Sequence, residues 1–189
     1  MPARDNEQWQ SLVARLSGQS LGGALKAELN AALDASGAMD GKVAVSGTGM
    51  RWGMEQLQAL LGPSFTVNAD AKGGGGAPYS VHIAKLDAGT VNVSGQAAFD
   101  PAKQSLNASL EAALATLAPL VPEMSGALKT KAAVSGSLSA LTFSLEAISN
   151  EVAAEAGTFQ EIRATVAGKA SLEENGKKSV SASADVALG

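Results

Sequence analysis

The strict alternation of apolar and polar residues is the feature that most constrains how this chain folds. Within residues 128–134 the apolar side chains fall on one side of an extended backbone, whereas Lys129 and Lys131 fall on the other. After Gly136 the same alternation resumes over residues 141–147. A period of two with one apolar face indicates half-buried antiparallel strands. These two segments therefore predict the two strands of one hairpin.

Looser copies of this pattern recur along the chain and predict about nine strands. They cover residues 25–33, 42–46, 65–83 with a glycine interruption at 73–76, 91–99, 106–110, 128–134, 141–147, 162–172 and 180–186. Apolar stripes near Leu12, Leu57 and Leu117 predict three short helical turns, and we expect residues 150–157 to form a loop or a further helical turn. Short strands and tight turns favour an all-β sheet that coils or folds over.

The predicted organisation is a single fragment, residues 1–189, of a longer repeating β-rich protein. Residues 1–18 are expected to form an N-terminal amphipathic helix, because Trp9, Leu12, Val13 and Leu16 have helical spacing. Residues 20–189 are expected to form the sheet. This expectation rests on the strand pattern that runs to the end of the chain.

The apolar residues of this chain are small. They make up 46% of the sequence, but 37 residues are Ala, three are Ile and 4% are aromatic. A closed core normally fills to the density of an organic crystal. Strand faces built from Ala and Val supply little volume, so the interior would be left partly unfilled. A bias toward Ala in the whole source genome explains the same composition equally well.

Charge and composition argue against several classes of partner. The formal net charge is −4, with acidic and basic residues interspersed, whereas a nucleic-acid-binding face is basic and clustered. No polybasic run suggests binding to anionic lipid heads. The chain contains no cysteine, which is compatible with the cytosol or the bacterial periplasm. The longest apolar run, beginning at residue 112, is far shorter than the roughly 18–20 residues that span a bilayer.

The candidate catalytic motifs lack their required context, so we predict no enzyme activity, no cofactor and no metal site. Residues 18–22 match G-x-S-x-G and His82 follows, but the motif lies after a predicted helix rather than after a strand. We therefore interpret His82 as exposed on the polar side of its strand. Residues 47–53 resemble a dinucleotide fingerprint whose third glycine comes one residue late. Trp9 and Trp52 are interpreted as packing anchors.

Several short motifs together resemble repeats of the TamB and AsmA-like family. In that family an apolar stretch ending near proline precedes hairpins of the form G-x-L-x-x-x-x-x-V-x-G. The matching segments here are Leu117-Ala118-Pro119-Leu120, Gly126-Ala127-Leu128-Lys129-Thr130 and Val134-Ser135-Gly136-Ser137-Leu138, with echoes at 21–52 and 93–100. The similarity covers most of residues 20–170, although each motif carries little information.

The resemblance implies a bacterial envelope protein of the β-taco type: an elongated, coiled antiparallel sheet folded into an open tube or taco with an apolar interior. It implies phospholipid transport between the inner and outer membranes, a periplasmic location with the parent protein anchored in the inner membrane, and phospholipid acyl chains as ligands. It also implies an outer-membrane barrel partner such as TamA, with which such proteins form a translocation and assembly module.

The residues expected to line a lipid groove are the larger apolar residues of the strands. They are Val43, Val45, Phe65, Val67, Val81, Ile83, Val91, Val93, Phe99, Leu106, Leu110, Val134, Phe143, Leu145, Ile162 and Val166. Three alternatives stay open at this point. The same residues fill the closed core of a sandwich or barrel, the chain is a structural β-solenoid with a filled interior, or it is an interaction module that aids outer-membrane protein assembly through its sheet edges.

Overall fold

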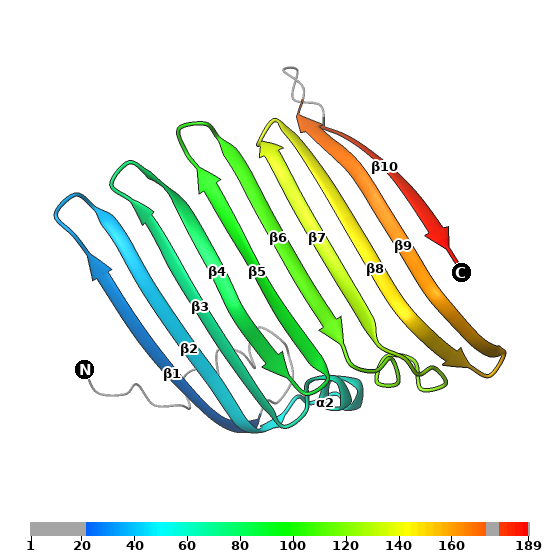
Figure 1. Ribbon diagram of the computed structural model, residues 1–189. Coiled ribbons are helices and arrows are strands. Elements are labelled where there is room, and N and C mark those ends of the chain that lie inside the picture. Colours follow the sequence, from blue (N-terminus) through cyan, green and yellow to red (C-terminus); the bar gives the residue numbers. More distant parts are fainter. Residues whose placement is uncertain (1–21, 173–177, 189) are drawn as a thin grey trace.

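The structure, a computed structural model, describes residues 22–172 and 178–188. It is an all-β fold in which ten strands form one open antiparallel sheet, with each strand paired to its neighbours in sequence (Figure 1). The strands are β1 (Gly22–Leu33), β2 (Ala38–Arg51), β3 (Ser64–Gly74), β4 (Ala77–Ala88), β5 (Val91–Asp100), β6 (Ser105–Leu114), β7 (Leu128–Ser137), β8 (Ala140–Ala154), β9 (Gly157–Leu172) and β10 (Lys178–Ala187). A short helix, α2 (Glu55–Leu61), lies between β2 and β3.

The connections between strands gather on two opposite rims of the sheet (Figure 1). The hairpin rim carries the turns that follow β1, β3, β5 and β7. The looped rim carries the connections that follow β2, β4, β6 and β8, which include α2 and the long segment 115–127. A sheet built only from consecutive antiparallel neighbours requires no crossover, so its two faces extend without interruption from β1 to β10.

Most of the predicted strands are confirmed, and three expectations are corrected. The described residues contain ten strands rather than about nine. The stripe near Leu57 forms α2, but the stripe near Leu117 is not a helix: 112–114 end β6, and 115–127 follow as hydrogen-bonded turns. The loop expected at 150–157 was also wrong, because β8 and β9 extend to a two-residue turn there. The helix predicted for residues 1–18 lies outside the described residues.

A β-bulge in β4 keeps the two faces of the sheet chemically distinct. Ile83 pairs with Gly95 of β5 and Leu86 pairs with Val93, so two residues of β4 oppose one residue of β5. Such an insertion shifts the alternation by one position. Without it, the residue after Ile83 on the apolar face would be Lys85. The bulge therefore places Leu86 on the apolar face and Lys85 on the polar face.

Candidate functional site

One face of the sheet is apolar from β1 to β10, and we call it the apolar face. Paired residues of neighbouring antiparallel strands project to the same side, so the register assigns each side chain to a face. All sixteen residues expected to line a groove lie on this face. The sequence thus located one continuous surface rather than scattered apolar residues.

Two central rows of residues cross all ten strands of the apolar face. The first row is Ala31, Gly41, Ala71, Val81, Ala97, Ala108, Val134, Phe143, Gly168 and Ala182. The second is Leu29, Val43, Ala69, Ile83, Gly95, Leu110, Ala132, Leu145, Val166 and Ala184. Neither row contains a charged or a hydrogen-bonding side chain. At about 4.8 Å between strands, each row is about 43 Å long.

A hollow lies where these rows cross the middle of the sheet. It has a volume of about 210 Å³ and is lined from β4, β5, β6 and β7. Its lining includes Gly95, which has no side chain, and the small side chains of Ala97, Ala108 and Ala132, while larger side chains such as that of Leu110 lie beside them. Pockets for drug-sized ligands enclose about 300–1,000 Å³. The hollow is therefore a shallow open trough rather than a closed pocket.

Aromatic side chains of the apolar face lie over glycines of the adjacent strand. A Cβ atom added to Gly47 would collide with the ring of Phe65, and one added to Gly168 would collide with the ring of Phe143. Gly73 lies under the side chain of Tyr79 in the same way. The glycines thus provide the space in which these rings rest against the sheet, an arrangement that fixes register and fills the gap left by a missing side chain.

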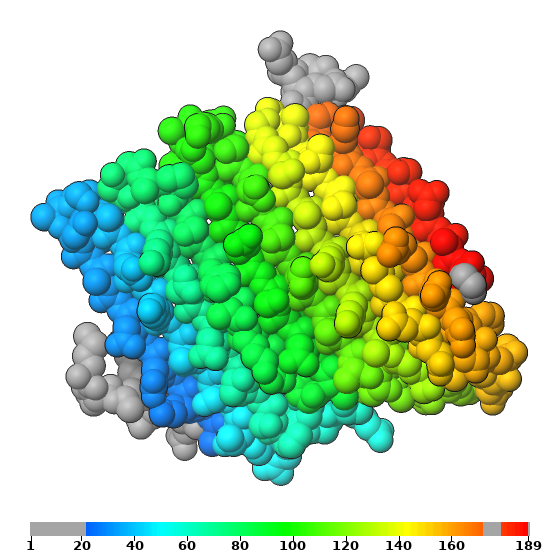
Figure 2. Space-filling view, in the orientation of Figure 1, coloured from blue at the N-terminus to red at the C-terminus, as the bar shows by residue number. Residues whose placement is uncertain are grey.

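The apolar face is not covered by a second layer of described elements. Its larger side chains in the middle of the sheet keep a substantial exposed fraction: 45% for Val81, 43% for Leu110 and 44% for Leu145. Figure 2 shows the strands following one another in sequence order across the face of the sheet that is in view. The closed sandwich or barrel that the sequence left open does not describe this sheet.

Full burial is concentrated at the looped rim. The buried side chains include Met50 near the end of β2, Ala88 at the end of β4 and Val152 near the end of β8. Ser149, also buried, donates its hydroxyl hydrogen bond to the carbonyl of Ala127 at 2.7 Å. These residues lie where the connections cover the end of the sheet, so the loops and not a facing sheet exclude water there.

Hydrogen bonds tie the connections of the looped rim to one another. The carbonyl of Leu60 in α2 accepts hydrogen bonds from the backbone N–H and the hydroxyl of Thr90, both at 3.0 Å. The Thr90 carbonyl in turn accepts from the N–H of Ala115 at 2.8 Å. The Trp52 indole donates to the carbonyl of Gly62 at 2.7 Å, and its ring lies 5.8 Å from that of Phe65. Trp52 is a packing residue, as predicted, whereas Trp9 lies outside the described residues.

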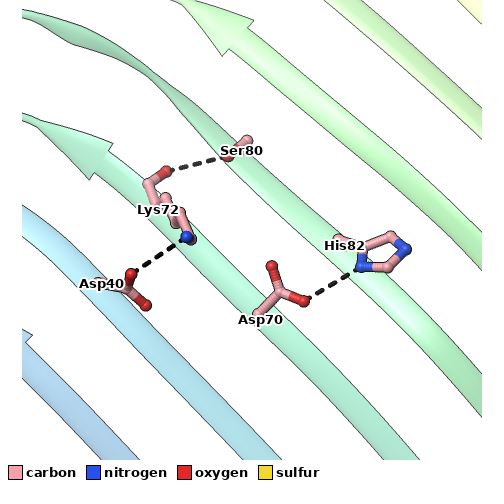
Figure 3. A network of polar contacts seen from close by, with 5 residues as sticks. All are labelled: Asp40, Asp70, Lys72, Ser80 and His82. Atoms are coloured by element: carbon pink, nitrogen blue, oxygen red, sulfur yellow. Dashed lines mark hydrogen bonds and ion pairs between the residues drawn. The ribbon is translucent and has the colours of Figure 1, made fainter.

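The opposite face is polar, and ionisable side chains contact one another across its adjacent strands. Figure 3 shows Asp40 of β2 paired with Lys72 of β3 at 3.2 Å, and Asp70 of β3 within 3.1 Å of the Nδ1 atom of His82 on β4. Glu111 and Lys131 pair in the same way at 3.1 Å. Exposed ion pairs contribute little to stability, but opposite charges placed directly across two strands favour one register.

Most described residues of the motifs that resemble catalytic or nucleotide-binding sequences lie in the sheet. His82 lies on the polar face with 53% of its side chain exposed, as predicted, while Ser20 lies outside the described residues. Gly47 and Gly49 belong to β2. No group of three or more His, Asp or Glu side chains within 22–172 and 178–188 is arranged to hold a metal ion. In the same part of the chain, no helix has the length and apolarity needed to cross a bilayer.

Sequence reasoning missed residues of the apolar face that lie after a break in the apolar–polar alternation or on the outermost strands. Leu86 was missed because the bulge breaks the alternation after Ile83; the signal that remained was a leucine between two charged residues, Lys85 and Asp87. Leu29 and Val180 were missed as lining residues although their strands were predicted, and they occupy the two outermost strands.

Comparisons with family models, with curated proteins and with solved structures found no match to this chain.

Proposed function

We propose that the apolar face binds the acyl chains of phospholipids and that the chain is a segment of a lipid-transport protein. The observation that carries this proposal is the pair of uncharged central rows, exposed across ten strands with a trough at their centre. A surface of this kind offers an acyl chain a continuous path and leaves the polar head group in water.

The energetic requirement for such a path is large. Moving a sixteen-carbon acyl chain from a bilayer into water costs on the order of 12 kcal/mol, at about 0.8 kcal/mol per methylene. Contact with one apolar surface offsets part of this cost, and a sheet that curls around the chain offsets more. A continuous row matters because every interruption by a charged side chain would restore the cost locally.

Membership of the TamB and AsmA-like family is part of the proposal and rests on the motifs at 117–138 and their echoes. With it come the periplasmic location, transport between the inner and outer membranes, and a barrel partner such as TamA for the full-length protein. The open sheet is compatible with this family's architecture. A solenoid with a filled core is disfavoured because the apolar side chains of the described residues are not enclosed.

The test is lipid retention by the purified chain, measured by native mass spectrometry after incubation with phospholipid vesicles. We expect bound phospholipid in the unchanged chain, and its loss in Leu145→Arg, because the new charge would lie in the second central row. Ser144→Arg is the matched control, since the neighbouring residue lies on the polar face of the same strand. Circular dichroism verifies that both variants fold. A folded Leu145→Arg variant that still carries lipid would remove this assignment of the face.

A further inference from the structure

The two outer strands of the sheet differ from the inner strands in one measurable respect. Large apolar side chains of the apolar face are 74% exposed at Leu29 of β1 and 72% exposed at Val180 and Val186 of β10. Side chains of the same types on inner strands, such as Leu110 and Val81, are 43–45% exposed. The difference is the surface that a neighbouring strand covers, because no described strand pairs with the outer edges of β1 and β10.

Along the outer edge of β10, the only charged residue in the phase of the apolar face is Lys178, at the first position of the strand. Sheet edges are commonly protected by proline, by a bulge or by a charged side chain on the inward face. β10 contains no proline, pairs with β9 over ten consecutive residues without a register shift, and presents Val180, Ala182, Ala184 and Val186 on the apolar face. Its outer backbone groups therefore form an uninterrupted template for a further strand.

We propose that β10 of one copy of this chain pairs with β1 of a second copy, so that the sheet and its apolar face continue from copy to copy. The number of strands makes this geometrically direct. In a sheet of ten consecutive antiparallel strands, β1 and β10 run in opposite directions. When a second copy is placed beside the first in the same orientation, its β1 therefore meets β10 in the antiparallel sense and with the same face apolar.

One register satisfies length, face and charge together. It places β10 (Lys178–Ala187) opposite residues 24–33 of the partner's β1, so that all ten residues of β10 have a partner. Val186 then faces Leu25, and Ala182 faces Leu29, which combines a large with a small side chain. On the polar face Asp185 faces Lys26. A shift by two residues in one direction places Asp185 opposite Glu28, and a shift in the other direction brings β10 against the register irregularity at residues 22–24 of β1.

The resulting contact is heterologous, because different edges of the two copies meet, and such contacts propagate into rings or open assemblies. Backbone hydrogen bonds supply the affinity and the alternating side chains supply the register, as in other cases of strand addition. The inference depends neither on lipid binding nor on the family assignment, since it uses only the two outer strands of this 189-residue chain and not the trough at the centre of the sheet.

The test uses analytical ultracentrifugation of the full chain over a range of concentrations, with one edge changed at a time. The β10 variant carries Val180→Lys and Val186→Lys, and the β1 variant carries Leu29→Lys and Leu33→Lys. Both place charges on the apolar face of an outer strand, where the side chains are mostly exposed in the single copy. The controls are Ser181→Lys and Asn30→Lys, which place the same charge on the polar face of the same strands.

We expect the unchanged chain and both controls to form assemblies that grow with concentration, and each edge variant alone to stay monomeric, with association weakened about tenfold or more. An equimolar mixture of the two edge variants should form a dimer and nothing larger, because only one intact β10 edge and one intact β1 edge then meet. Leu110→Lys, in the middle of the apolar face, should leave assembly unchanged.

Three results would overturn the proposal. A monomeric unchanged chain at all concentrations would show that the edges do not pair. Self-association of either edge variant alone would indicate a symmetric contact between two like edges, or pairing with a different partner strand. Loss of assembly in Leu110→Lys, with assembly kept in the edge variants, would indicate that two apolar faces stack on each other.

Discussion

Two valines of this sheet differ widely in their exposure to solvent. Val152, at the looped rim, is 4% exposed, whereas Val81, on the apolar face, is 45% exposed. Val81 has a strand partner on either side, whereas Val152 pairs with Phe159 of β9 on one side and the bridge between Ser125 and Ala153 lies on the other. The difference arises because connecting segments fold over the end of the sheet near Val152, while no described element covers the sheet at Val81.

The comparison indicates a division of roles within one layer of structure. The looped rim supplies enclosed packing and the hydrogen bonds between connections, so we expect it to hold much of the side-chain contribution to stability. The apolar face contributes cross-strand contacts but keeps a large area in contact with solvent. A surface that is not needed to close a core is free to hold a guest, which is the basis of the proposed function.

The largest expected effect tests the register on which the apolar face depends. Deleting Ala133 from β7 moves every following side chain of that strand to the opposite face, so we expect loss of cooperative folding. Deleting Ala84 removes the extra residue of the bulge and leaves Leu86 in phase with Ile83, so most of the stability should remain. Urea unfolding followed by circular dichroism measures both. Equal damage from the two deletions would contradict the register described here.

The next effect compares a buried charge at the rim with one on the face. Val152→Asp places a carboxylate where water is excluded, so we expect a loss of about 3–5 kcal/mol in the free energy of unfolding. Val81→Asp leaves its carboxylate in contact with solvent, so we expect a loss of only about 1 kcal/mol in the free energy of unfolding. The measurement is again chemical denaturation. A greater loss for Val81→Asp would mean that the face is enclosed in solution.

A smaller effect uses truncation in place of charge. Met50→Ala removes a buried side chain at the looped rim and should cost about 2–3 kcal/mol, since the surrounding loops close the cavity only partly. Leu29→Ala removes a side chain that is 74% exposed and should change the free energy of unfolding by less than about 0.5 kcal/mol. Thermal denaturation of the two variants, side by side, measures the difference. Similar melting temperatures would argue against a packed rim.

The smallest effect concerns the hairpin rim and pH. The Ser36 hydroxyl donates to Asp34 at 2.6 Å and the N–H of Ala38 donates at 2.9 Å, and these bonds hold the pKa of Asp34 below its ordinary value. Because the pKa of Asp34 is lowered in the folded protein, its carboxylate stabilises the fold at pH values above the unfolded pKa of about 4. This stabilisation is lost as the pH falls through the folded pKa. An NMR titration should show Asp34 titrating below that value. In Asp34→Asn this part of the acid dependence should disappear.

The strands were predictable because period-two alternation is a local signal that survives without knowledge of tertiary contacts. It placed all sixteen residues that were expected to line a groove on one face, including residues as far apart in the sequence as Val43 and Val166. The apolar run around Leu117 misled the prediction because Ala and Leu favour helix locally, whereas anchoring to Gly126 and Thr90 fixes the segment as turns. The bulge beside Ile83 was not predictable, because it depends on the pairing of three strands at once.

The most direct test of the central claim uses the absence of cysteine from this chain. Leu110→Cys places one thiol on the apolar face, and Gln96→Cys places one on the polar face nearby. We predict that a water-soluble maleimide labels both rapidly, and that a monomeric lysophospholipid slows labelling at residue 110 while leaving residue 96 unchanged. A thiol at residue 110 that is unreactive without lipid would show a closed face, and equal labelling of both with lipid present would contradict binding of acyl chains there.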